Sequence, residues 1–357
     1  MKALLAAGGT GGHMFPAQSL SEELTRLGWR CAMITDARGQ KHAGRIKADP
    51  IIQVAAASIS PRHPLKAIRG GLKLIKGVRQ AKDFMRDWQP DIVVGFGGYP
   101  SFPALRAAES LNIPRVIHEQ NAVLGRVNRF FASKANVVAS GFEQLEKLPS
   151  DANHVVVGNP LRDAILDAAK SVSVDNQPDL HILIVGGSLG ANILSDVVPQ
   201  ALAALPDRLQ RRLHVTQQVT ASRIEQANQI YAAAGMSANL ETFFPDIERH
   251  LSKADLIMAR AGASSVSEIA LMGKPSILIP LAIAMDDHQT ANAKALERLG
   301  AAKIVPESEF KPEPLTQLLT EILNDTDWLD QAGRNAKKLA RPDAARDLAA
   351  LVIAAAG

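Results

Sequence analysis

The chain has 357 residues, of which 46% are hydrophobic and 21% are charged; this is typical of soluble globular proteins and long enough for two domains. The single cysteine, Cys31, excludes a disulfide framework and favours a reducing compartment, and no apolar run approaches the roughly 20 residues of a membrane-spanning helix. The net charge of +4 is mild, and the 4% aromatic content disfavours single-stranded nucleic acid, so we expect no nucleic-acid partner.

Short apolar runs alternate with helical patterns along almost the whole chain, which is typical of parallel sheets with crossover helices. In the first half they predict strands near residues 2–7, 31–35, 51–55, 91–95, 114–118 and 136–139. In the second half they predict strands near 154–157, 181–185, 213–216, 240–243, 256–259, 276–280 and 302–305. We therefore expect an α/β protein of two doubly wound, Rossmann-like domains that face each other across a cleft and bind ligands at the carboxyl ends of strands.

The first predicted strand continues directly into "GGTGGHMFPA", residues 8–17, where four glycines precede a lone histidine. Glycine costs about 0.5–1 kcal/mol relative to alanine in regular structure, so this cluster requires a reason. Pro16 suits the first position of a helix whose apolar face extends from Ala17 to Leu27. A strand, a glycine turn and a helix N-terminus together offer backbone N–H groups to a phosphate.

Two more glycine turns follow, "GFGGYPS" at 95–101 and "VGGSLGAN" at 185–192. The dinucleotide fingerprint G-x-G-x-x-G fits poorly, because Met14 stands where its third glycine belongs. Asp36 follows the second strand and can imitate the acidic residue that binds a ribose, so a dinucleotide oxidoreductase stays open as an alternative.

Gly158, Asn159 and Pro160 interrupt the pattern in "VVVGNPLRD", residues 155–163, and mark the join between the domains. We predict an N-terminal domain over 1–157 and a C-terminal domain over 158–340. The last segment, 341–357, is predicted to be a helix that either completes the second domain or packs back on the first.

Seven motifs occur in a characteristic order: "GGTGGHMFPA", "GFGGYPS", "HEQNAVLGRVNR" (118–129), "VGNPLR" (157–162), "GGSLGA", "RAGASSVSE" (260–268) and "DDHQTANA" (286–293). In these motifs the chain closely resembles the MurG family of peptidoglycan glycosyltransferases over nearly its whole length. The resemblance implies the GT-B fold, with the acceptor site in the first domain and the nucleotide site in the second. It also implies an inverting transfer of N-acetylglucosamine from UDP-N-acetylglucosamine to the 4-hydroxyl of the muramyl sugar of lipid I, undecaprenyl-pyrophosphoryl-muramyl-pentapeptide, which forms lipid II in peptidoglycan synthesis.

His13 is the first catalytic candidate. A helix N-terminus disfavours the imidazolium form, and a neutral imidazole is a competent general base for the proton of the acceptor hydroxyl. The structural alternative is a histidine that only hydrogen-bonds the glycine loop, whereas the family resemblance implies a catalytic or acceptor-orienting role. Thr10, Gly11 and Gly12 are expected to present N–H groups to the sugar and the acceptor diphosphate.

The segment "HEQN", 118–121, follows an apolar run and is predicted to lie at the carboxyl end of a strand. Glu119 is a second candidate for the base or for an orienting group, and the residues alone do not separate it from His13. Asn121 suits an N-acetyl or hydroxyl group of the donor sugar, although asparagine also initiates turns. His118 is expected to be structural.

In the second domain, Ser188 and its neighbouring amides are expected to hold the UDP pyrophosphate at a helix N-terminus. The segment "SVSE", 265–268, has the pattern of a capping box in which Glu268 reaches back to the Ser265 N–H, and the resemblance implies that Glu268 accepts ribose hydroxyls. The resemblance also places Gln289 on the sugar hydroxyls and the uracil near Phe244. The expected substrate-binding set of this region comprises Arg162, Ser188, Phe244, Ala263, Ser264, Ser265, Val266, Ser267, Glu268 and Gln289.

Arg162 can neutralise a phosphate or lie near the base, and the alternative is an ordinary surface arginine. Asp286 and Asp287 precede a predicted helix and are interpreted as its cap. We expect no essential metal and no cofactor, because helix dipoles and cationic side chains can neutralise the leaving diphosphate.

The segment from His63 to Trp88 alternates basic and apolar residues. Gly70, Gly71 and Gly77 weaken the prediction of a helix, and the pattern by itself favours a solvated basic face. The lipid acceptor implied by the resemblance reverses that preference and predicts peripheral binding to an anionic surface at the cytoplasmic face of the bacterial plasma (inner) membrane. The expected membrane contacts are Lys66, Arg69, Leu72, Lys73, Ile75, Lys76 and Arg79.

Beside the dinucleotide oxidoreductase, three further alternatives stay open. Another GT-B UDP-sugar transferase would act on a soluble acceptor, and a UDP-N-acetylglucosamine epimerase would depend on carboxylates more than on His13. A nucleotide-sugar-binding regulator would show no turnover. If the protein is the transferase, other proteins of cell-wall synthesis are further expected partners.

Overall fold

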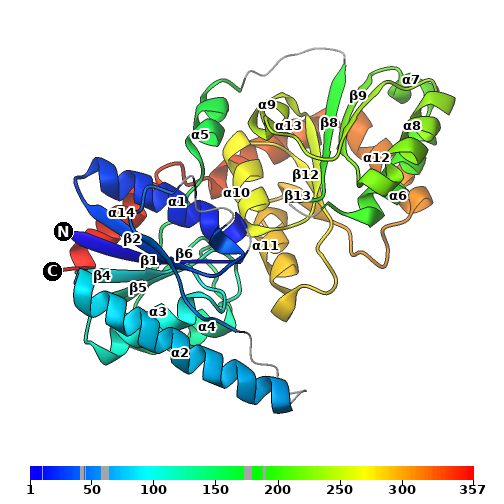
Figure 1. Ribbon diagram of the computed structural model, residues 1–357. Helices are drawn as coiled ribbons and strands as arrows, with labels where there is room; N and C mark the ends of the chain where they lie inside the picture. The colour runs from blue at the N-terminus through cyan, green and yellow to red at the C-terminus, as the bar shows by residue number, and fades with distance from the viewer. Residues whose placement is uncertain (10, 41–43, 45, 58–63, 173–178, 188–189) are drawn as a thin grey trace. The chain divides into compact units, whose positions relative to one another are not determined.

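A computed structural model of the chain describes residues 1–9, 11–40, 44, 46–57, 64–172, 179–187 and 190–357. The chain divides into two compact units, the first made of Met1–Arg162 with Arg341–Gly357 and the second of Asp163–Ala340. Each unit is a parallel sheet with helices on both faces (Figure 1). The predicted α/β class with two Rossmann-like domains is therefore confirmed. Among the described residues, no helix combines the length and the apolar character needed to cross a bilayer.

The sheet of the first unit has seven strands in the order β3-β2-β1-β4-β5-β6-β7. They are β1 (Lys2–Ala6), β2 (Arg30–Thr35), β3 (Ile51–Gln53), β4 (Ile92–Gly95), β5 (Arg115–Glu119), β6 (Val137–Ser140) and β7 (His154–Val156). Successive residues of β1 point into opposite cores, Leu4 into one and Leu5 into the other, which is why this strand is a continuous apolar run. The sequence pattern groups the strand near 154–157 with the second half, but β7 pairs with β6 and closes the first sheet.

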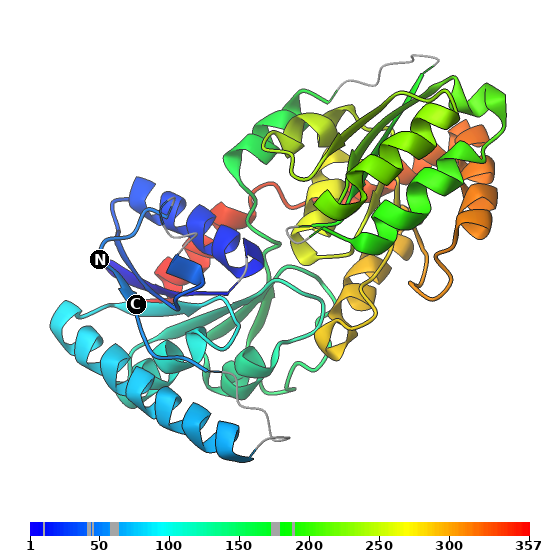
Figure 2. The same cartoon turned by 45° about the vertical axis from the view of Figure 1, so that its right-hand side comes forward.

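Two helices cover one face of this sheet and three cover the other. α1 (Gly11–Arg26) and α14 (Ala344–Ala355) pack side by side on one face (Figure 2). On the other face lie α2 (Pro64–Trp88), α3 (Ser101–Ser110) and α4 (Arg126–Phe131), with a 3-10 turn at Ala132–Lys134. The C-terminal helix thus belongs to the first unit, beside the N-terminal strand and helix.

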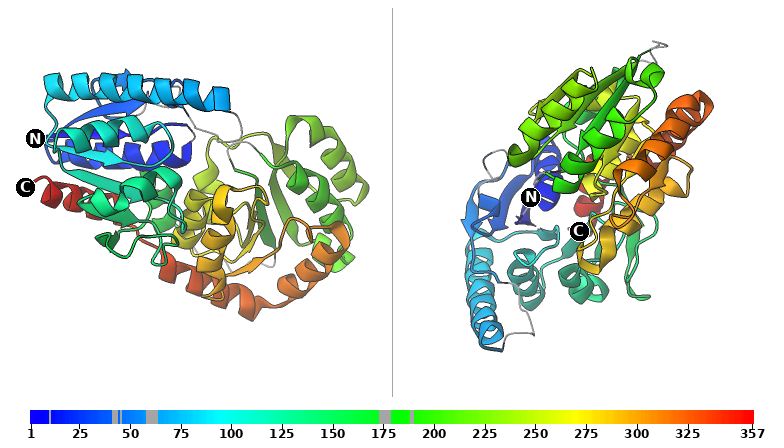
Figure 3. Two further views of the ribbon diagram at one scale, coloured as in Figure 1. Left: turned by 90° about the horizontal axis from the view of Figure 1, so that it is seen from below. Right: turned by 90° about the vertical axis from the view of Figure 1, so that its right-hand side faces the viewer.

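Two local predictions need correction. Pro16 is not the first residue of α1, because Gly11 and Gly12 already adopt helical geometry and the proline lies inside the helix. The glycines of α2 do not interrupt it, and α2 lies along α3 as one continuous helix (Figure 3). Gly77 has a packing reason, since a Cβ there would collide with the carbonyl oxygen of Ala55.

The sheet of the second unit has six strands in the order β10-β9-β8-β11-β12-β13. They are β8 (Leu180–Val185), β9 (Leu213–Gln218), β10 (Ala238–Glu241), β11 (Leu256–Ala259), β12 (Ser276–Leu278) and β13 (Ala302–Ile304). The helices are α5 (Asp163–Lys170), α6 (Asn192–Ala203), α7 (Asp207–Gln210), α8 (Ile224–Ala233), α9 (Ile247–Lys253), α10 (Ala263–Met272), α11 (His288–Glu297), α12 (Pro312–Asn324) and α13 (Thr326–Ala336). Short 3-10 turns occupy Ala221–Arg223, Met285–Asp287 and Lys337–Leu339.

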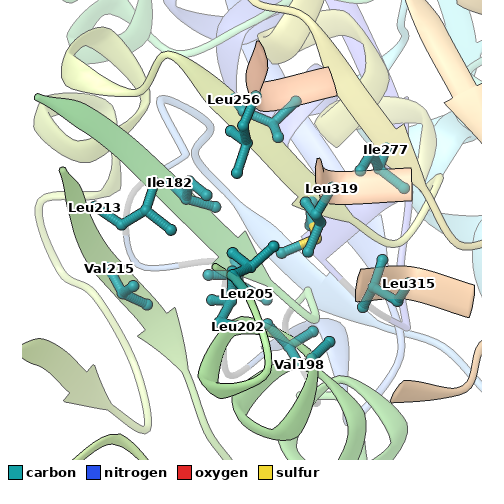
Figure 4. Packing of buried hydrophobic residues seen from close by; sticks show 14 of the residues in the cluster. Ile182, Val198, Leu202, Leu205, Leu213, Val215, Leu256, Ile277, Leu315 and Leu319 are labelled. Atoms are coloured by element: carbon teal, nitrogen blue, oxygen red, sulfur yellow. The ribbon is translucent and has the colours of Figure 1, made fainter. Parts of the chain in front are cut away.

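Aliphatic side chains fill the core between this second sheet and the helices α6 and α12. Ile182, Leu213 and Leu256 project from the strands toward Leu202 of α6 and Leu319 of α12 (Figure 4). Burying one such side chain contributes about 1.5–3 kcal/mol relative to leaving it exposed. The packed sheet therefore provides a rigid base for the loops at its carboxyl edge.

Both sheets have one point where the strand order reverses, between β1 and β4 in the first unit and between β8 and β11 in the second. Loops that leave neighbouring strands in opposite directions part at such a point, and ligands of doubly wound folds bind there. The glycine turns after β1 and β4 flank the first of these points, and the turn after β8 flanks the second.

Candidate active site

His13 lies in the first turn of α1, beside the point where β1 and β4 end. Its Nδ1 is 2.9 Å from Oε1 of Gln120, the residue that follows β5. The other edge of the ring faces the second glycine turn: a Cβ built on Gly98, whose φ is +70°, would lie 3.5 Å from Nε2 of His13. The left-handed backbone explains the glycine at 98, and the His13 ring lies within van der Waals contact of this position.

His118, on β5, is fully buried and belongs to the same hydrogen-bonded group. Its Nε2 is 3.0 Å from the carbonyl oxygen of Gly158, and its Nδ1 is 2.9 Å from Nε2 of Gln120. The pKa of His118 is lowered to about 4, mainly by burial. The hydrogen bond to Gly158 acts against this shift, and the nearby His13 acts with it. The ring is therefore neutral at neutral pH.

The carboxylate of Glu119 is enclosed by donors and is only 2% exposed. Oε1 accepts bonds from the backbone and side-chain nitrogens of Asn121, at 3.1 and 3.2 Å. Oε2 accepts bonds from the Gly125 N–H at 2.9 Å and from Nδ2 of Asn128 at 2.8 Å. Both oxygens thus accept two bonds each, which occupies the acceptor directions that a general base needs.

Asp36 connects the first two glycine turns. Its Oδ1 accepts the N–H of Gly9 at 3.1 Å and that of Gly39 at 2.9 Å, while its Oδ2 accepts the hydroxyl of Tyr99 at 2.7 Å. Burial raises the pKa of Asp36, but the bonds from Gly39, Tyr99 and Gly9 outweigh it and the net pKa is lowered. Because this carboxylate is used for internal bonds, the geometry does not support the ribose contact of a dinucleotide oxidoreductase.

The remaining candidates of the first unit lie around the same edge. Gly11 and Gly12 are the first two residues of α1, and Thr10 lies outside the described residues. Arg162 ends the stretch Met1–Arg162 of the first unit, and its guanidinium lies 5.1 Å from the centroid of the Phe15 ring on α1. Asn121 is partly buried and tied to Glu119.

In the second unit, Gln218 at the end of β9 braces the glycine turn. Its Oε1 accepts the Gly186 N–H at 3.0 Å, and its Nε2 donates to the carbonyls of Gly187 at 3.2 Å and Thr242 at 3.1 Å. One side chain therefore connects the expected phosphate turn to the segment expected near the uracil. Ser188, the predicted phosphate ligand, lies outside the described residues.

Helix α10 begins earlier than the predicted capping box requires. Gly262 is its N-cap, so Ser265 is the third helical residue and not the cap, and the predicted capping box is wrong. The physical reason is that the extended Gly262 already ends the turn after β11. The first N–H groups of a helix have no intrahelical acceptor. In α10 these are the N–H groups of Ala263, Ser264 and Ser265. Val266 is buried, whereas Ser267 and Glu268 are partly exposed in the following turn.

A bidentate ion pair supports the loop between β12 and α11. Nη2 of Arg260 lies 3.2 Å from Oε1 of Glu307, and its Nη1 donates to the carbonyls of Ile279 and Pro280 at 3.2 Å. Glu307 also accepts the Ala282 N–H at 3.1 Å. The hydrogen bond from Arg260 is the main cause that lowers the pKa of Glu307.

Gln289 lies in the first turn of α11 and its Oε1 accepts the Leu281 N–H at 2.9 Å. The amide nitrogen is the end of this side chain that remains to donate to a ligand. Asp287 is the N-cap of α11 as predicted, but its Oδ1 accepts the Thr290 hydroxyl at 2.7 Å instead of a helix N–H. Within the described ranges, no group of three or more His, Cys, Asp or Glu side chains is arranged to hold a metal ion.

Phe244 is buried and its ring lies 4.7 Å from that of His250, so its side chain packs inside the unit. Only its backbone can face a base, while the neighbouring Phe243 is 66% exposed.

The predicted site does not include the supporting residues Gln120, Gln218, Arg260 and Glu307. Gln120 and Arg260 lie within the quoted motifs, but nothing in the order of residues indicates what their side chains hold.

On α2, the residues predicted to contact a membrane are exposed wherever their side chains are described. Leu72 and Ile75 are each 63% exposed, and the basic side chains around them are also exposed: Arg69, Lys73, Lys76 and Arg79. Nothing is described for the side chain of Lys66. Apolar residues of an ordinary amphipathic helix face the core, so the outward position of Leu72 and Ile75 is the unusual feature.

Comparisons with known proteins agree with this geometry. The glycosyltransferase family 28 N-terminal domain matches residues 3–140, and the family 28 C-terminal domain matches residues 181–348. The proteins named UDP-N-acetylglucosamine–N-acetylmuramyl-(pentapeptide) pyrophosphoryl-undecaprenol N-acetylglucosamine transferase in Maricaulis maris and Caulobacter vibrioides are 48% and 42% identical to this chain. The alignments cover 98% of this chain and 96% and 98% of those proteins.

Among solved structures, MurG of Acinetobacter baumannii is 34% identical, with a TM-score of 0.83 over 99% of both chains. A UDP-GlcNAc 2-epimerase of Neisseria meningitidis has a TM-score of 0.70 at 14% identity, over 99% of this chain and 100% of its own, which reflects the shared fold alone. The expected GT-B architecture of two Rossmann-like domains is thereby confirmed. The chain belongs to glycosyltransferase family 28, among the UDP-N-acetylglucosamine–N-acetylmuramyl-(pentapeptide) pyrophosphoryl-undecaprenol N-acetylglucosamine transferases.

Proposed function

We propose that the protein transfers N-acetylglucosamine from UDP-N-acetylglucosamine to the 4-hydroxyl of the muramyl sugar of lipid I, with inversion, and so forms lipid II in peptidoglycan synthesis. A relative that carries this transferase name is 48% identical over nearly the whole chain. The observation that carries the proposal is His13, held by Gln120 on one ring edge and placed at the β1–β4 switch point.

In this mechanism Nε2 of His13 takes the proton of the acceptor hydroxyl while its oxygen attacks the anomeric carbon of the donor. The bond from that carbon to the UDP oxygen breaks, and UDP leaves with the electron pair. The N–H groups of the first turn of α10 and of the glycine turn after β8 stabilise the developing charge on the diphosphate. A general base of this kind contributes roughly 10²–10⁴-fold to the rate.

Glu119 is assigned a supporting role and not that of the base. Its four hydrogen bonds fix the turn that carries Asn121, and Asn121 is proposed to contact the N-acetyl or hydroxyl groups of the donor sugar. The two catalytic candidates therefore differ in what their polar atoms already bind. His13 keeps one ring nitrogen for the acceptor, whereas both oxygens of Glu119 are used.

The donor is proposed to bind along the carboxyl edge of the second sheet. Glu268 accepts the ribose hydroxyls, the amide nitrogen of Gln289 donates to the sugar, and the backbone at Phe244 meets the uracil. Arg162 is proposed to neutralise a phosphate. The support for this arrangement is that Gln218 and the Arg260–Glu307 pair hold the loops that carry these groups.

We also propose that the exposed face of α2 made of Arg69, Leu72, Lys73, Ile75, Lys76 and Arg79 binds anionic lipid at the cytoplasmic face of the plasma membrane. Two exposed aliphatic side chains among basic ones suit the boundary between headgroups and acyl chains. Each basic residue near such a surface contributes about 1 kcal/mol. Peripheral binding of this kind would bring the protein to its lipid-linked acceptor.

The decisive assay incubates the purified protein with labelled UDP-N-acetylglucosamine, with and without a short-chain lipid I analogue, and follows sugar transfer and UDP release. The proposal expects acceptor-dependent transfer that falls by at least about 10²-fold in His13→Ala, with donor binding retained. Epimerisation of the donor without transfer would contradict the proposed reaction. Full transfer in His13→Ala would remove the base assignment alone.

A further inference from the structure

We propose that Gln120 and His118 are positioning residues that fix the ring proton of His13 on Nδ1 and so keep the lone pair of Nε2 available to the acceptor hydroxyl. The inference rests on the proposed role of His13 as the base. Four groups form one continuous chain of hydrogen bonds: the Gly158 carbonyl, His118, Gln120 and His13.

The direction of this chain is set at its buried end. A carbonyl oxygen only accepts, so the 3.0 Å contact between Gly158 O and Nε2 of His118 requires a proton on that nitrogen. His118 is fully buried, and burial lowers its pKa to about 4, so the neutral ring carries a single proton. Its Nδ1 therefore presents a lone pair.

The amide of Gln120 can then adopt only one orientation. Its Nε2 lies 2.9 Å from the lone pair on Nδ1 of His118 and 3.1 Å from the backbone oxygen of His118. Both neighbours are acceptors, so the NH₂ end of the amide faces them. The carbonyl end, Oε1, consequently faces His13.

Oε1 of Gln120 lies 2.9 Å from Nδ1 of His13, and an amide oxygen only accepts. Nδ1 of His13 must therefore carry the proton, and in the neutral ring Nε2 has the lone pair. That nitrogen is on the edge that faces Gly98. The proton assignment thus follows from the Gly158 carbonyl through three hydrogen bonds.

The segment after β7 anchors both positioning residues of this arrangement. The Gly158 carbonyl fixes His118, and Nδ2 of the adjacent Asn159 donates to the backbone oxygen of Gln120 at 3.0 Å. Gln120 continues to accept from Nδ1 when His13 becomes protonated at Nε2, so no side chain has to turn during the transfer. The opposite tautomer would point an N–H at the acceptor hydroxyl and could not take its proton.

The size of the effect can be bounded from chemistry. In serine proteases, loss of tautomer control over the catalytic histidine costs about 10⁴-fold in kcat. Gln120 is neutral and does not stabilise an imidazolium as a carboxylate does, so the expected loss in Gln120→Leu is smaller. We expect kcat to fall by at least about tenfold, but by no more than the roughly 10²–10⁴-fold that a general base supplies. The Kd for UDP-N-acetylglucosamine should be unchanged.

The direct test is nitrogen-15 NMR of the full chain labelled only at histidine, with His13→Ala and His118→Leu used for assignment. In the wild type we expect His13 to be protonated at Nδ1 and His118 at Nε2. In Gln120→Leu we expect His13 to populate the form with the proton on Nε2. A wild-type His13 protonated at Nε2 would overturn the proposal, whether or not the protein transfers sugar.

Gln120→Glu gives a second, more specific signature. One carboxyl oxygen still accepts from Nδ1 of His13, while the other faces Nδ1 and the backbone oxygen of His118 and must carry the proton that the NH₂ group supplied. We therefore expect His13 to stay protonated at Nδ1, His118 to stay protonated at Nε2, and kcat to exceed that of Gln120→Leu. Loss of the Nδ1 proton of His13 in Gln120→Glu would contradict the relay.

Gln217→Leu is the matched control. Gln217 is also a fully buried glutamine with both amide ends bonded, to the Tyr231 hydroxyl at 2.6 Å and the Leu194 carbonyl at 3.0 Å. Its loss should leave the tautomers of His13 and His118 unchanged, and a shift of His13 in this variant would overturn the assignment to Gln120. If His13→Ala proves fully active while the wild-type tautomers are as expected, the base assignment fails and the hydrogen-bond chain stands.

Discussion

At the scale of single residues, the burial of His118 has a cost that depends on pH. The folded protein holds His118 neutral with a pKa of about 4, whereas an unfolded histidine has a pKa near 6.5. Protonation therefore favours the unfolded state between these values, and the contribution present above pH 6.5 is lost as pH falls through about 4. The difference corresponds to about 3 kcal/mol in the free energy of unfolding.

The measurement is urea unfolding of the wild type and of His118→Leu at several values between pH 7 and pH 4. We expect the variant to be less stable at pH 7 but to lose about 3 kcal/mol less on acidification. Burial also lowers the pKa values of His154 and His181, so part of the slope should survive in the variant. An identical slope in both proteins would contradict the assignment to His118.

A second prediction separates the roles of His13 and Glu119. Glu119→Gln replaces one acceptor oxygen by an NH₂ group that faces donors, so at least one buried N–H loses its partner at a cost of about 1–3 kcal/mol. We expect a lower melting temperature and a higher KM for the donor, with kcat within about tenfold of the wild type. If turnover instead falls by about 10²-fold or more while stability is unchanged, Glu119 returns to the role of base.

These residues show how far a sequence can be interpreted without coordinates. His13 and Glu119 are identifiable because each is an ionisable side chain beside a glycine turn or at a strand end. What distinguishes them is the bonds that each group already makes. Glu119 accepts four bonds from Asn121, Gly125 and Asn128, whereas Nδ1 of His13 donates to Oε1 of Gln120, which lies 107 residues away in sequence. The same applies to "SVSE", where local pattern suggests a capping box but the turn after β11 places the helix start at Gly262 and Ala263.

At the scale of elements, the loop between β12 and α11 depends on the Arg260–Glu307 pair. Glu307→Gln keeps the volume but removes the charge opposite a buried guanidinium and weakens the bond to the Ala282 N–H. We expect the KM for UDP-N-acetylglucosamine to rise several-fold or more, with a smaller change in kcat, because the loop positions Gln289. Steady-state kinetics with varied donor test this, and a lowered kcat with unchanged KM would contradict it.

Glu309→Gln is the control for that experiment. Glu309 is exposed, lies two residues from Glu307, and its side chain forms no hydrogen bond or ion pair within the described part of the chain. It changes the charge of the protein by the same amount without reaching the loop. We expect its donor KM to match the wild type.

The basic face of α2 supports a prediction about lipid. Replacing Lys73, Lys76 and Arg79 by glutamine removes three charges beside the exposed Leu72 and Ile75, and each charge contributes about 1 kcal/mol at an anionic surface. We expect sedimentation with vesicles that contain phosphatidylglycerol to fall by more than tenfold. Transfer to a short-chain, water-soluble acceptor should be retained.

The charge-matched control replaces three exposed basic residues of the second unit, Arg334, Lys337 and Lys338. A general electrostatic attraction would weaken equally in both triple variants, which would contradict a specific role for α2. Binding of the α2 variant that equals the wild type would contradict the proposed contact altogether.

The glycines of α2 argue against a helix when only the sequence is considered, and the close approach of Ala55 explains why Gly77 is needed there.

At the scale of the whole molecule, the order of strands and helices is predictable because both sheets are buried on both faces. Strands of this type are continuous apolar runs, and the predicted positions agree with every strand of both sheets to within a few residues. The path of the chain from one unit to the other is harder to predict from the sequence. The predicted boundary at residue 157 places the strand near 154–157 in the first domain, where it pairs with β6, although the strand pattern counts it with the second half. The return of the C-terminal helix to α1 leaves no local signal, because packing partners are chosen in space.

The return of α14 to the first unit leads to a prediction about how the molecule unfolds. Leu348 and Val352 of α14 are fully buried in the core shared with α1 and β1, and each contributes about 1.5–3 kcal/mol by burial. Deleting residues 341–357 should therefore destabilise the first unit and leave the second, Asp163–Ala340, with its core intact. We expect calorimetry of the truncated chain to show an early transition for the first unit and a second transition that UDP-N-acetylglucosamine still raises. One transition that no longer responds to the donor would contradict the independence of the two cores.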